Sequence, residues 1–123
     1  MKEKRVQYFT DTEEEFVSLL IEIGIRKNVA KLLVFFANTP SATSREIERG
    51  TDLRQPEVSM AVKQLADKGW IKERNNHSEN KGRPEKNYSL AVPVEKIIAA
   101  IEKAKKNEIH NQLELVRKIR KCI

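Results

Sequence analysis

The hydrophobic period of the chain changes twice, and these changes restrict its fold more than any other feature. Up to Gly69, apolar residues recur at the three- and four-residue spacing of helices. Two short segments with partly alternating polarity follow, residues 70–74 and 86–90, and they favour β-strands. From Pro93 onward the helical spacing returns. The sequence therefore predicts a mainly α-helical chain with one small β-hairpin.

Capping signals predict two helices before residue 40. Each residue of the run 10–12 is followed three positions later by a glutamate, which is the spacing of a capping box and places acids where the helix dipole favours them. Gly24 is expected to end the first helix, and a second helix begins near Ile25 or Arg26. Pro40 ends the second helix, because proline disfavours helical geometry at the residue before it.

Two shorter helices follow, separated by a tight turn. Thr43, with a glutamate three residues later, has the spacing of a capping box for a helix that ends near Gly50. Pro56 suits the first position of the next helix, which Gly69 ends. Two helices joined by a turn as short as residues 51–55 have the spacing of a helix-turn-helix.

The last segment, residues 93–123, is predicted to be one long helix of roughly 45 Å if it is unbroken. Its apolar residues keep helical spacing at both ends, but the spacing weakens at residues 105–108, where we expect a kink. One small body cannot bury so long an apolar stripe, so part of it is expected to pack against another chain. The chain thus divides into residues 1–92 and 93–123.

The residues around the tight turn also resemble a known family. Residues 43–47 (TSREI), 53–65 (LRQPEVSMAVKQL) and 68–71 (KGWI) resemble the winged helix-turn-helix transcription regulators, in particular the MarR and TrmB-like regulators of archaea. The resemblance covers roughly residues 25–92. It implies a winged helix-turn-helix fold whose hairpin is the wing, followed by a long C-terminal dimerisation helix. It also implies a sequence-specific regulator that binds a palindromic site in double-stranded DNA as a homodimer.

The helix that begins near Pro56 is the expected recognition helix. If its aliphatic side chains face the core, the others must point away, and they carry amide, hydroxyl and cationic groups that can reach base edges in a major groove. The alternative is a plain solvated face. The expected recognition residues are Gln55, Pro56, Glu57, Ser59, Met60, Lys63 and Gln64. Contacts to the DNA backbone are expected from Thr43, Ser44, Arg45 and Arg54.

The loop between the strands is polar and basic. A stiff turn carrying arginine at its presumed tip, residues 81–84, suits a narrow, electronegative minor groove or a phosphate. The alternative is a soluble turn whose basic residues prevent aggregation at the sheet edge. The expected wing contacts are Arg74, Lys81, Arg83 and Lys86.

The net charge of +6 is unevenly distributed along the chain. Residues 51–71 hold three positive and three negative charges, whereas residues 72–86 hold five against three and residues 87–123 hold eight against four. The helix-turn-helix is therefore neutral as a segment. We expect the wing to supply much of the electrostatic affinity for DNA.

The terminal helices are the expected dimer interface. In the family that the chain resembles, these helices pair two subunits, and two-fold symmetry then matches a palindromic site. The alternative is a long helix that folds back over its own domain. The interface candidates are Phe16, Leu20, Ile97, Ile101, Ile109, Leu113, Val116 and Ile119.

Other kinds of chemistry have little support in the sequence. No serine, histidine and acid fall in a nucleophile arrangement and no glycine-rich phosphate loop is present, so an enzyme is not expected. His77, His110 and Cys122 do not have the spacing of a metal-ligand cluster, so neither a metal nor another cofactor is expected. No window is apolar enough for a membrane span. The single cysteine fits a reducing compartment, which favours the cytoplasm.

Two other kinds of protein remain open. One is a winged-helix adaptor that binds other proteins through its terminal helix. The other is a sensor that binds a small molecule between its helices, although the sequence identifies neither the effector nor its site. DNA retention that survives competitor DNA favours the regulator, whereas partner capture without DNA binding favours the adaptor.

Overall fold

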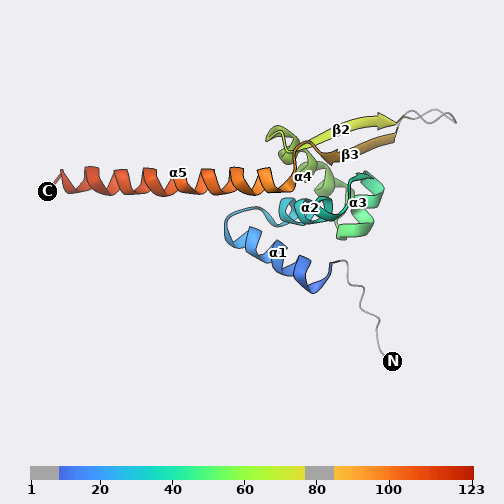
Figure 1. Cartoon of the computed structure of the whole chain (residues 1–123), viewed down its shortest axis with the longest axis horizontal. Helices are drawn as coiled ribbons and strands as arrows, with labels where there is room; N and C mark the ends of the chain where they lie inside the picture. The colour runs from blue at the N-terminus through green and yellow to red at the C-terminus, as the bar shows by residue number, and fades with distance from the viewer. Residues whose placement is uncertain (1–8, 77–84) are drawn as a thin grey trace, which may run out of the picture. The chain divides into compact units, whose positions relative to one another are not determined.

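The described part of the chain, residues 9–76 and 85–123 of a computed structural model, is mainly helical with one small sheet. The backbone falls into two units, Met1–Val92 and Pro93–Ile123. The elements are α1 (Asp11–Glu22), α2 (Lys27–Asn38), β1 (Ser41–Thr43), α3 (Ser44–Thr51), α4 (Gln55–Asp67), β2 (Ile71–Asn76), β3 (Glu85–Leu90) and α5 (Val94–Arg120) (Figure 1).

Capping boxes begin α1 and α3, as the sequence predicts. The Thr10 hydroxyl accepts a hydrogen bond from the Glu13 N–H at 3.1 Å, and the Glu13 carboxylate accepts one from the Thr10 N–H at 2.8 Å. Thr43 and Glu46 make the same exchange at 3.2 and 2.9 Å. Each helix therefore begins where side chains satisfy backbone N–H groups that the helix itself leaves unpaired.

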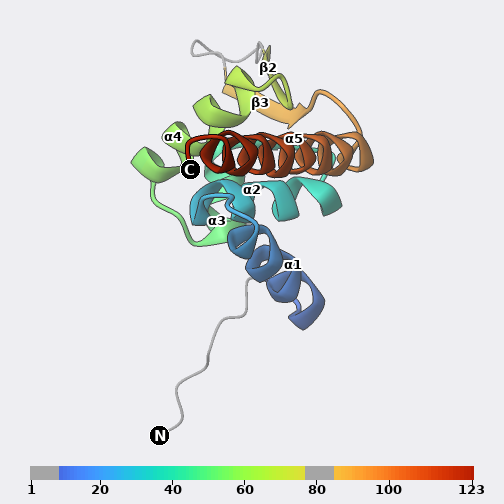
Figure 2. The ribbon, with the colours of Figure 1, turned by 90° about the vertical axis from the view of Figure 1, so that its left-hand side faces the viewer.

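Helix α2 lies at the centre of the first unit, between α1 on one side and α4 with the strands on the other (Figure 1 and Figure 2). The apolar side chains of α2, α3 and α4 recur on one face of each helix and form the core. The buried apolar side chains of these helices include Val29, Leu32, Leu33, Phe36, Ile47, Val58, Ala61, Val62 and Leu65. The core thus holds α4 by its inner face and leaves the opposite face exposed.

A buried threonine fixes the turn between α3 and α4. The Thr51 hydroxyl donates a hydrogen bond to the Ile47 carbonyl at 2.7 Å and accepts one from the Leu53 N–H at 3.3 Å. The next residue, Asp52, adopts a left-handed φ of 61°, a conformation that aspartate tolerates better than most residues do. These two bonds tie the last turn of α3 to the turn residue Leu53.

Helix α3 ends at Thr51, within one residue of the predicted end near Gly50, but the glycine is not the residue that ends it. Gly50 instead lies against Phe35 of α2. A Cβ atom at Gly50 would stand 2.9 Å from the Phe35 ring atom Cδ1, which is too close for a normal contact. The glycine is needed for the close approach of two helices rather than for a helix end. Gly24 and Gly69 do have the positive φ of helix-ending glycines, 112° and 78°.

The sheet contains a strand that the sequence did not predict. The predicted hairpin is present as β2 and β3, and β1 adds to it in the antiparallel order β1-β3-β2. The register places Ser41 and Lys72 on either side of Ser89. Strand β1 is three residues long, too short to show a hydrophobic period, and its partner lies far along the chain.

The second unit contains α5, which has 27 residues and runs without a break. It is about 40 Å long at the rise of an α-helix. The kink predicted at residues 105–108 is wrong, since the helix continues through them. Two ion pairs lie in this stretch, one between Lys105 and Glu108 at 3.3 Å and one between Lys106 and Glu102 at 3.2 Å.

Candidate nucleic-acid interface

The exposed face of α4 carries the residues predicted to read DNA. The helix begins at Gln55, one residue before Pro56, and the Glu57 carboxylate accepts a hydrogen bond from the Arg54 N–H at 2.9 Å. Of the predicted residues, Gln64 is half-buried, and the exposed ones are Gln55, Pro56, Glu57, Ser59, Met60 and Lys63. Helix α4 therefore presents amide, hydroxyl, thioether and ammonium groups to its surroundings.

Two of these side chains are already paired with each other. The Gln55 amide nitrogen Nε2 donates a hydrogen bond to the Ser59 hydroxyl at 3.1 Å, one helical turn later. This bond leaves the Gln55 carbonyl oxygen and the Ser59 hydroxyl hydrogen able to meet a base edge. A pair that is ordered before binding loses less conformational entropy when it binds. Glu57, by contrast, acts as a helix cap.

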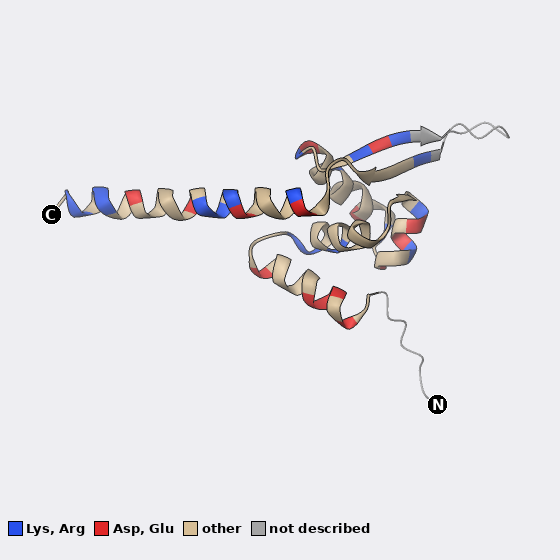
Figure 3. Ribbon diagram, viewed as in Figure 1, with Lys and Arg blue, Asp and Glu red and all other residues tan. Residues whose placement is uncertain are grey.

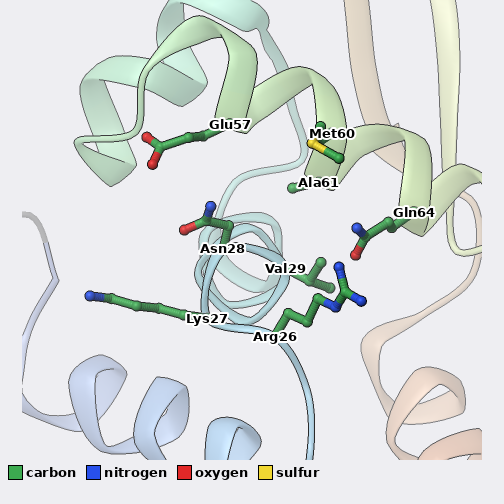
Figure 4. A pocket seen from close by; sticks show the side chains of 8 residues that line it. All are labelled: Arg26, Lys27, Asn28, Val29, Glu57, Met60, Ala61 and Gln64. Carbon is green, nitrogen blue, oxygen red and sulfur yellow. The ribbon is translucent and has the colours of Figure 1, made fainter.

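A hollow of about 360 Å³ separates the flank of α4 from the start of α2 (Figure 4). Figure 4 shows the Arg26 guanidinium group directed towards the Gln64 amide. We call the exposed side of α4 the reading face, and it consists of Gln55, Pro56, Glu57, Ser59, Met60, Lys63 and Gln64. The packing of α2 against α4 thus brings two cations, Arg26 and Lys27, to the edge of the reading face. The other lining residues are Asn28, Val29, Glu57, Met60 and Ala61.

Arg26 and Lys27 were missed by the sequence reasoning. The sum of charges over residues 51–71 makes the helix-turn-helix neutral as a segment. In the folded chain, however, Arg26 and Lys27 of the α2 region lie beside α4 and add positive charge there. Five acids of the first fifty residues lie on α1, which carries no base (Figure 3). The spacing of residues along the sequence does not show which residues of α2 lie near α4. Only the tertiary contact between the two helices shows that Arg26 and Lys27 lie beside α4.

The predicted contacts to the DNA backbone differ in what they can offer. Thr43 is half-buried, and its hydroxyl is engaged in the capping box of α3. Ser44, the first residue of α3, is also half-buried. Arg45 and Arg54 are exposed, and neither forms an ion pair with another described residue. The two arginines are therefore the better candidates for phosphate contacts.

The predicted wing residues do not act as one set. Arg74 and Lys86 belong to opposite faces of the hairpin, because Arg74 pairs in register with Asn87, the residue next to Lys86. The Lys86 ammonium lies 3.7 Å from the Glu73 carboxylate on its own face. Lys86 is therefore left out of the proposed wing contacts. The two remaining candidates, Lys81 and Arg83, lie outside the described residues.

The predicted dimer residues divide into buried and exposed ones. Leu20, Ile97 and Ile101 are 5%, 0% and 8% exposed in the single chain. Their place in a dimer interface stays a prediction. Phe16 is half-buried. The apolar residues of outer α5 are 46–63% exposed, and they are Ile109, Leu113, Val116 and Ile119.

Within residues 9–76 and 85–123, no group of three or more histidine, cysteine, aspartate or glutamate side chains could hold a metal ion. None of the helices described in the structure is long and apolar enough to cross a membrane.

The sequence model of the MarR family matches residues 23–83, which include α2, α3 and α4. No curated protein matches the chain. Among solved structures, the chain is similar to TrmBL2, an archaeal chromatin protein, with a TM-score of 0.70 and 16% identity over 89% of this chain. The chain spans only 39% of the length of TrmBL2.

Two further structures are similar over most of their own length. A possible transcriptional regulator from Methanosarcina mazei Go1 has a TM-score of 0.60 and 17% identity, over 82% of this chain and 86% of that one. The Multiple Antibiotic Resistance Repressor, MarR, has a TM-score of 0.55 and 16% identity, over 83% and 72%. Likenesses at such low identity show the fold alone.

The core helices, the short turn and the three-stranded sheet define a winged helix-turn-helix protein, as the sequence predicted. The MarR family model matches this part of the chain, 61 of its 123 residues. Members of this family are transcription regulators, not enzymes, so the family supports the prediction that the chain is not an enzyme.

Proposed function

We propose that this protein is a transcription regulator that binds double-stranded DNA sequence-specifically, as a homodimer on a palindromic site. The observation that carries the proposal is the exposed polar face of α4, which follows the turn held by the Thr51 hydroxyl. A helix presented in this way fits the major groove of B-DNA, where each base pair shows a distinct pattern of donors and acceptors.

The residues around α4 have different proposed roles. Gln55 and Ser59 read base edges as a pair, and the 63% exposed Met60 adds an apolar contact such as one to a thymine methyl group. Cationic side chains bind phosphates, which positions the protein without carrying sequence information. The proposed phosphate contacts are Lys63, Arg45 and Arg54.

The homodimer is proposed from the outer part of α5. An exposed apolar stripe on an otherwise charged helix marks an interaction surface, and a two-fold axis makes such a stripe complementary to itself. Two copies related in this way carry two α4 helices with inverted orientation, which a palindromic site matches. The residues of the stripe are Ile109, Leu113, Val116 and Ile119.

Helix α1 stays in the proposed interface through Phe16 and Leu19. Leu19 is 56% exposed on a helix that carries five acids. The last turn of α5 carries three bases, Arg117, Lys118 and Arg120. Opposite charges beside apolar side chains favour a contact between α1 of one copy and α5 of the other.

Selection of bound sequences from random double-stranded DNA tests the proposal. We expect a symmetric motif to be enriched over successive rounds, and the selected DNA to stay bound in excess competitor. Sedimentation is expected to show a mass twice that of the 14.2 kDa chain. Absence of an enriched motif contradicts sequence-specific recognition. Capture of a protein partner through α5 without any DNA binding would instead support an adaptor.

A further inference from the structure

The sheet has a polar face opposite the face that covers the core. Side chains alternate along each strand, and Ala42, Ile71 and Tyr88 are the buried ones. Their neighbours in sequence point the other way, where the register aligns Ser41, Ser89 and Lys72 across the three strands. We name this surface the outer sheet face, and it consists of Ser41, Lys72, Arg74, Asn87 and Ser89.

The outer sheet face is hollowed. All five of its residues line one hollow of about 310 Å³ together with Pro40 and Tyr88. Neighbouring strands lie about 4.8 Å apart, so the backbones at Ser41 and Lys72, two strands apart, are separated by roughly 10 Å. A tetrahedral oxyanion fits between side chains at this separation and can contact residues of all three strands.

Among the described residues that line the hollow there are cations and hydrogen-bond donors but no acid. Lys72 and Arg74 are both exposed, and neither forms an ion pair with a residue that the structure describes. Ser41, Ser89 and Asn87 supply two hydroxyl groups and an amide. Cationic donors form shorter and stronger hydrogen bonds to phosphate oxygens than neutral donors do. The chemistry of the hollow therefore matches a phosphate group.

We propose that the outer sheet face binds a phosphate group. Lys72 and Arg74 neutralise its charge, while the side chains of Ser41, Ser89 and Asn87 donate hydrogen bonds to its oxygens. The site is separate from the reading face of α4, and it needs β1, because Ser41 belongs to that strand. The phosphate belongs either to the backbone of bound DNA or to a small phosphorylated molecule.

Titration of the full chain with inorganic phosphate, followed by backbone amide NMR, tests the site directly. We expect saturable shifts at residues 72–74 and 87–89. Arg74→Gln is expected to weaken phosphate binding about tenfold, because it removes one of two cations that bind the group. Lys86→Gln is the matched control, since it removes the same charge from the opposite face of the same hairpin. The control should bind phosphate as the parent does.

The source of the phosphate is tested with double-stranded DNA at several salt concentrations. If DNA supplies the phosphate, the slope of log affinity against log salt should be shallower by about 0.9 in Arg74→Gln and unchanged in Lys86→Gln. If a small molecule supplies it, Arg74→Gln loses phosphate binding and keeps the parent's DNA slope. Thermal unfolding of each variant checks that it is folded.

Two results would overturn the proposal. One is an equal loss in both variants, because it would show an effect of net charge alone. The other is the absence of saturable shifts at the outer sheet face together with equal DNA slopes in both variants. A parent chain that binds phosphate but no DNA contradicts the proposed function and leaves the phosphate site standing, so the two failures are distinguishable.

Discussion

Gly50 of α3 lies against the aromatic ring of Phe35 of α2, with no room for a side chain between them. This contact determines how closely the first helix of the helix-turn-helix approaches the core. Since α3 leads through the turn at Thr51 into α4, the position of the reading face depends on it. The contact joins residues on two helices and is invisible to any local reading of the sequence.

Gly50→Ala is expected to destabilise the protein by about 1–3 kcal/mol, because the new methyl group overlaps the Phe35 ring. At a solvent-exposed position inside a helix, the same change stabilises the protein by about 1 kcal/mol. The sign of the change in unfolding free energy therefore shows whether the Phe35 ring leaves room for the methyl group. Urea unfolding measures it. Phe35→Leu combined with Gly50→Ala should recover part of the loss. A more stable Gly50→Ala protein would show that the two helices separate without cost.

Thr51→Val is expected to cost about 1–3 kcal/mol, since it leaves the buried Ile47 carbonyl and Leu53 N–H without their hydroxyl partner. Thr51→Ser keeps the hydroxyl and is the matched control. Both are measured by chemical denaturation. Equal stability of the valine and serine variants would mean that the hydroxyl does not hold the turn.

Gln55→Ala is expected to relax base preference at one position of each half-site by about 1–3 kcal/mol, while Lys63→Gln weakens all sequences alike and reduces the salt slope by about 0.9. The first change removes a reader of base edges and the second removes a phosphate contact. Quantitative binding to a panel of single-base variants of the selected site separates them. Identical profiles for the two proteins would contradict the division of roles.

Lys27→Gln is expected to make the salt slope of DNA binding shallower by about 0.9, because Lys27 lies at the edge of the reading face. Lys31→Gln is the control, since Lys31 stands one turn further along α2 and does not line the hollow beside α4. Both slopes come from titrations with the selected DNA. An unchanged slope in Lys27→Gln would place α2 away from the DNA.

Leu113→Asp is expected to raise the dimer dissociation constant by more than about tenfold, because it places an unpaired carboxylate inside an apolar contact. Asn111→Asp introduces the same charge two residues earlier, off the apolar stripe, and should leave the dimer intact. Analytical ultracentrifugation over a range of concentrations measures both. If both variants dissociate alike, charge repulsion rather than loss of the stripe is responsible.

The sequence was informative wherever a short stretch contained the whole cause. The capping boxes at Thr10 and Thr43 and the inner face of α4 each depend on residues within a few turns of one helix. The kink expected in α5 was wrong because apolar spacing alone was considered. Lys106 and Glu102, one turn apart, form an ion pair of the kind that supports a helix where its apolar stripe is interrupted.

Features that join distant segments were not predictable from the sequence. Strand β1 is recognisable only from its pairing with β3, and Arg26 reaches the reading face only because α2 packs on α4. The opposite placement of Arg74 and Lys86 needed the register of the hairpin. Lys81 and Arg83, predicted at the wing tip, remain predictions.

Thr43 belongs to two elements, because it is both the last residue of β1 and the N-cap of α3. It pairs in register with Asn87 of β3 while its hydroxyl begins the first helix of the helix-turn-helix. The sheet at the root of the wing and the first helix of the helix-turn-helix are therefore joined directly at Thr43, with no connecting residue between them. A duplex that meets both must adapt its own curvature and groove width. The stiffness of its base-pair steps would then contribute to selectivity even where no side chain touches a base.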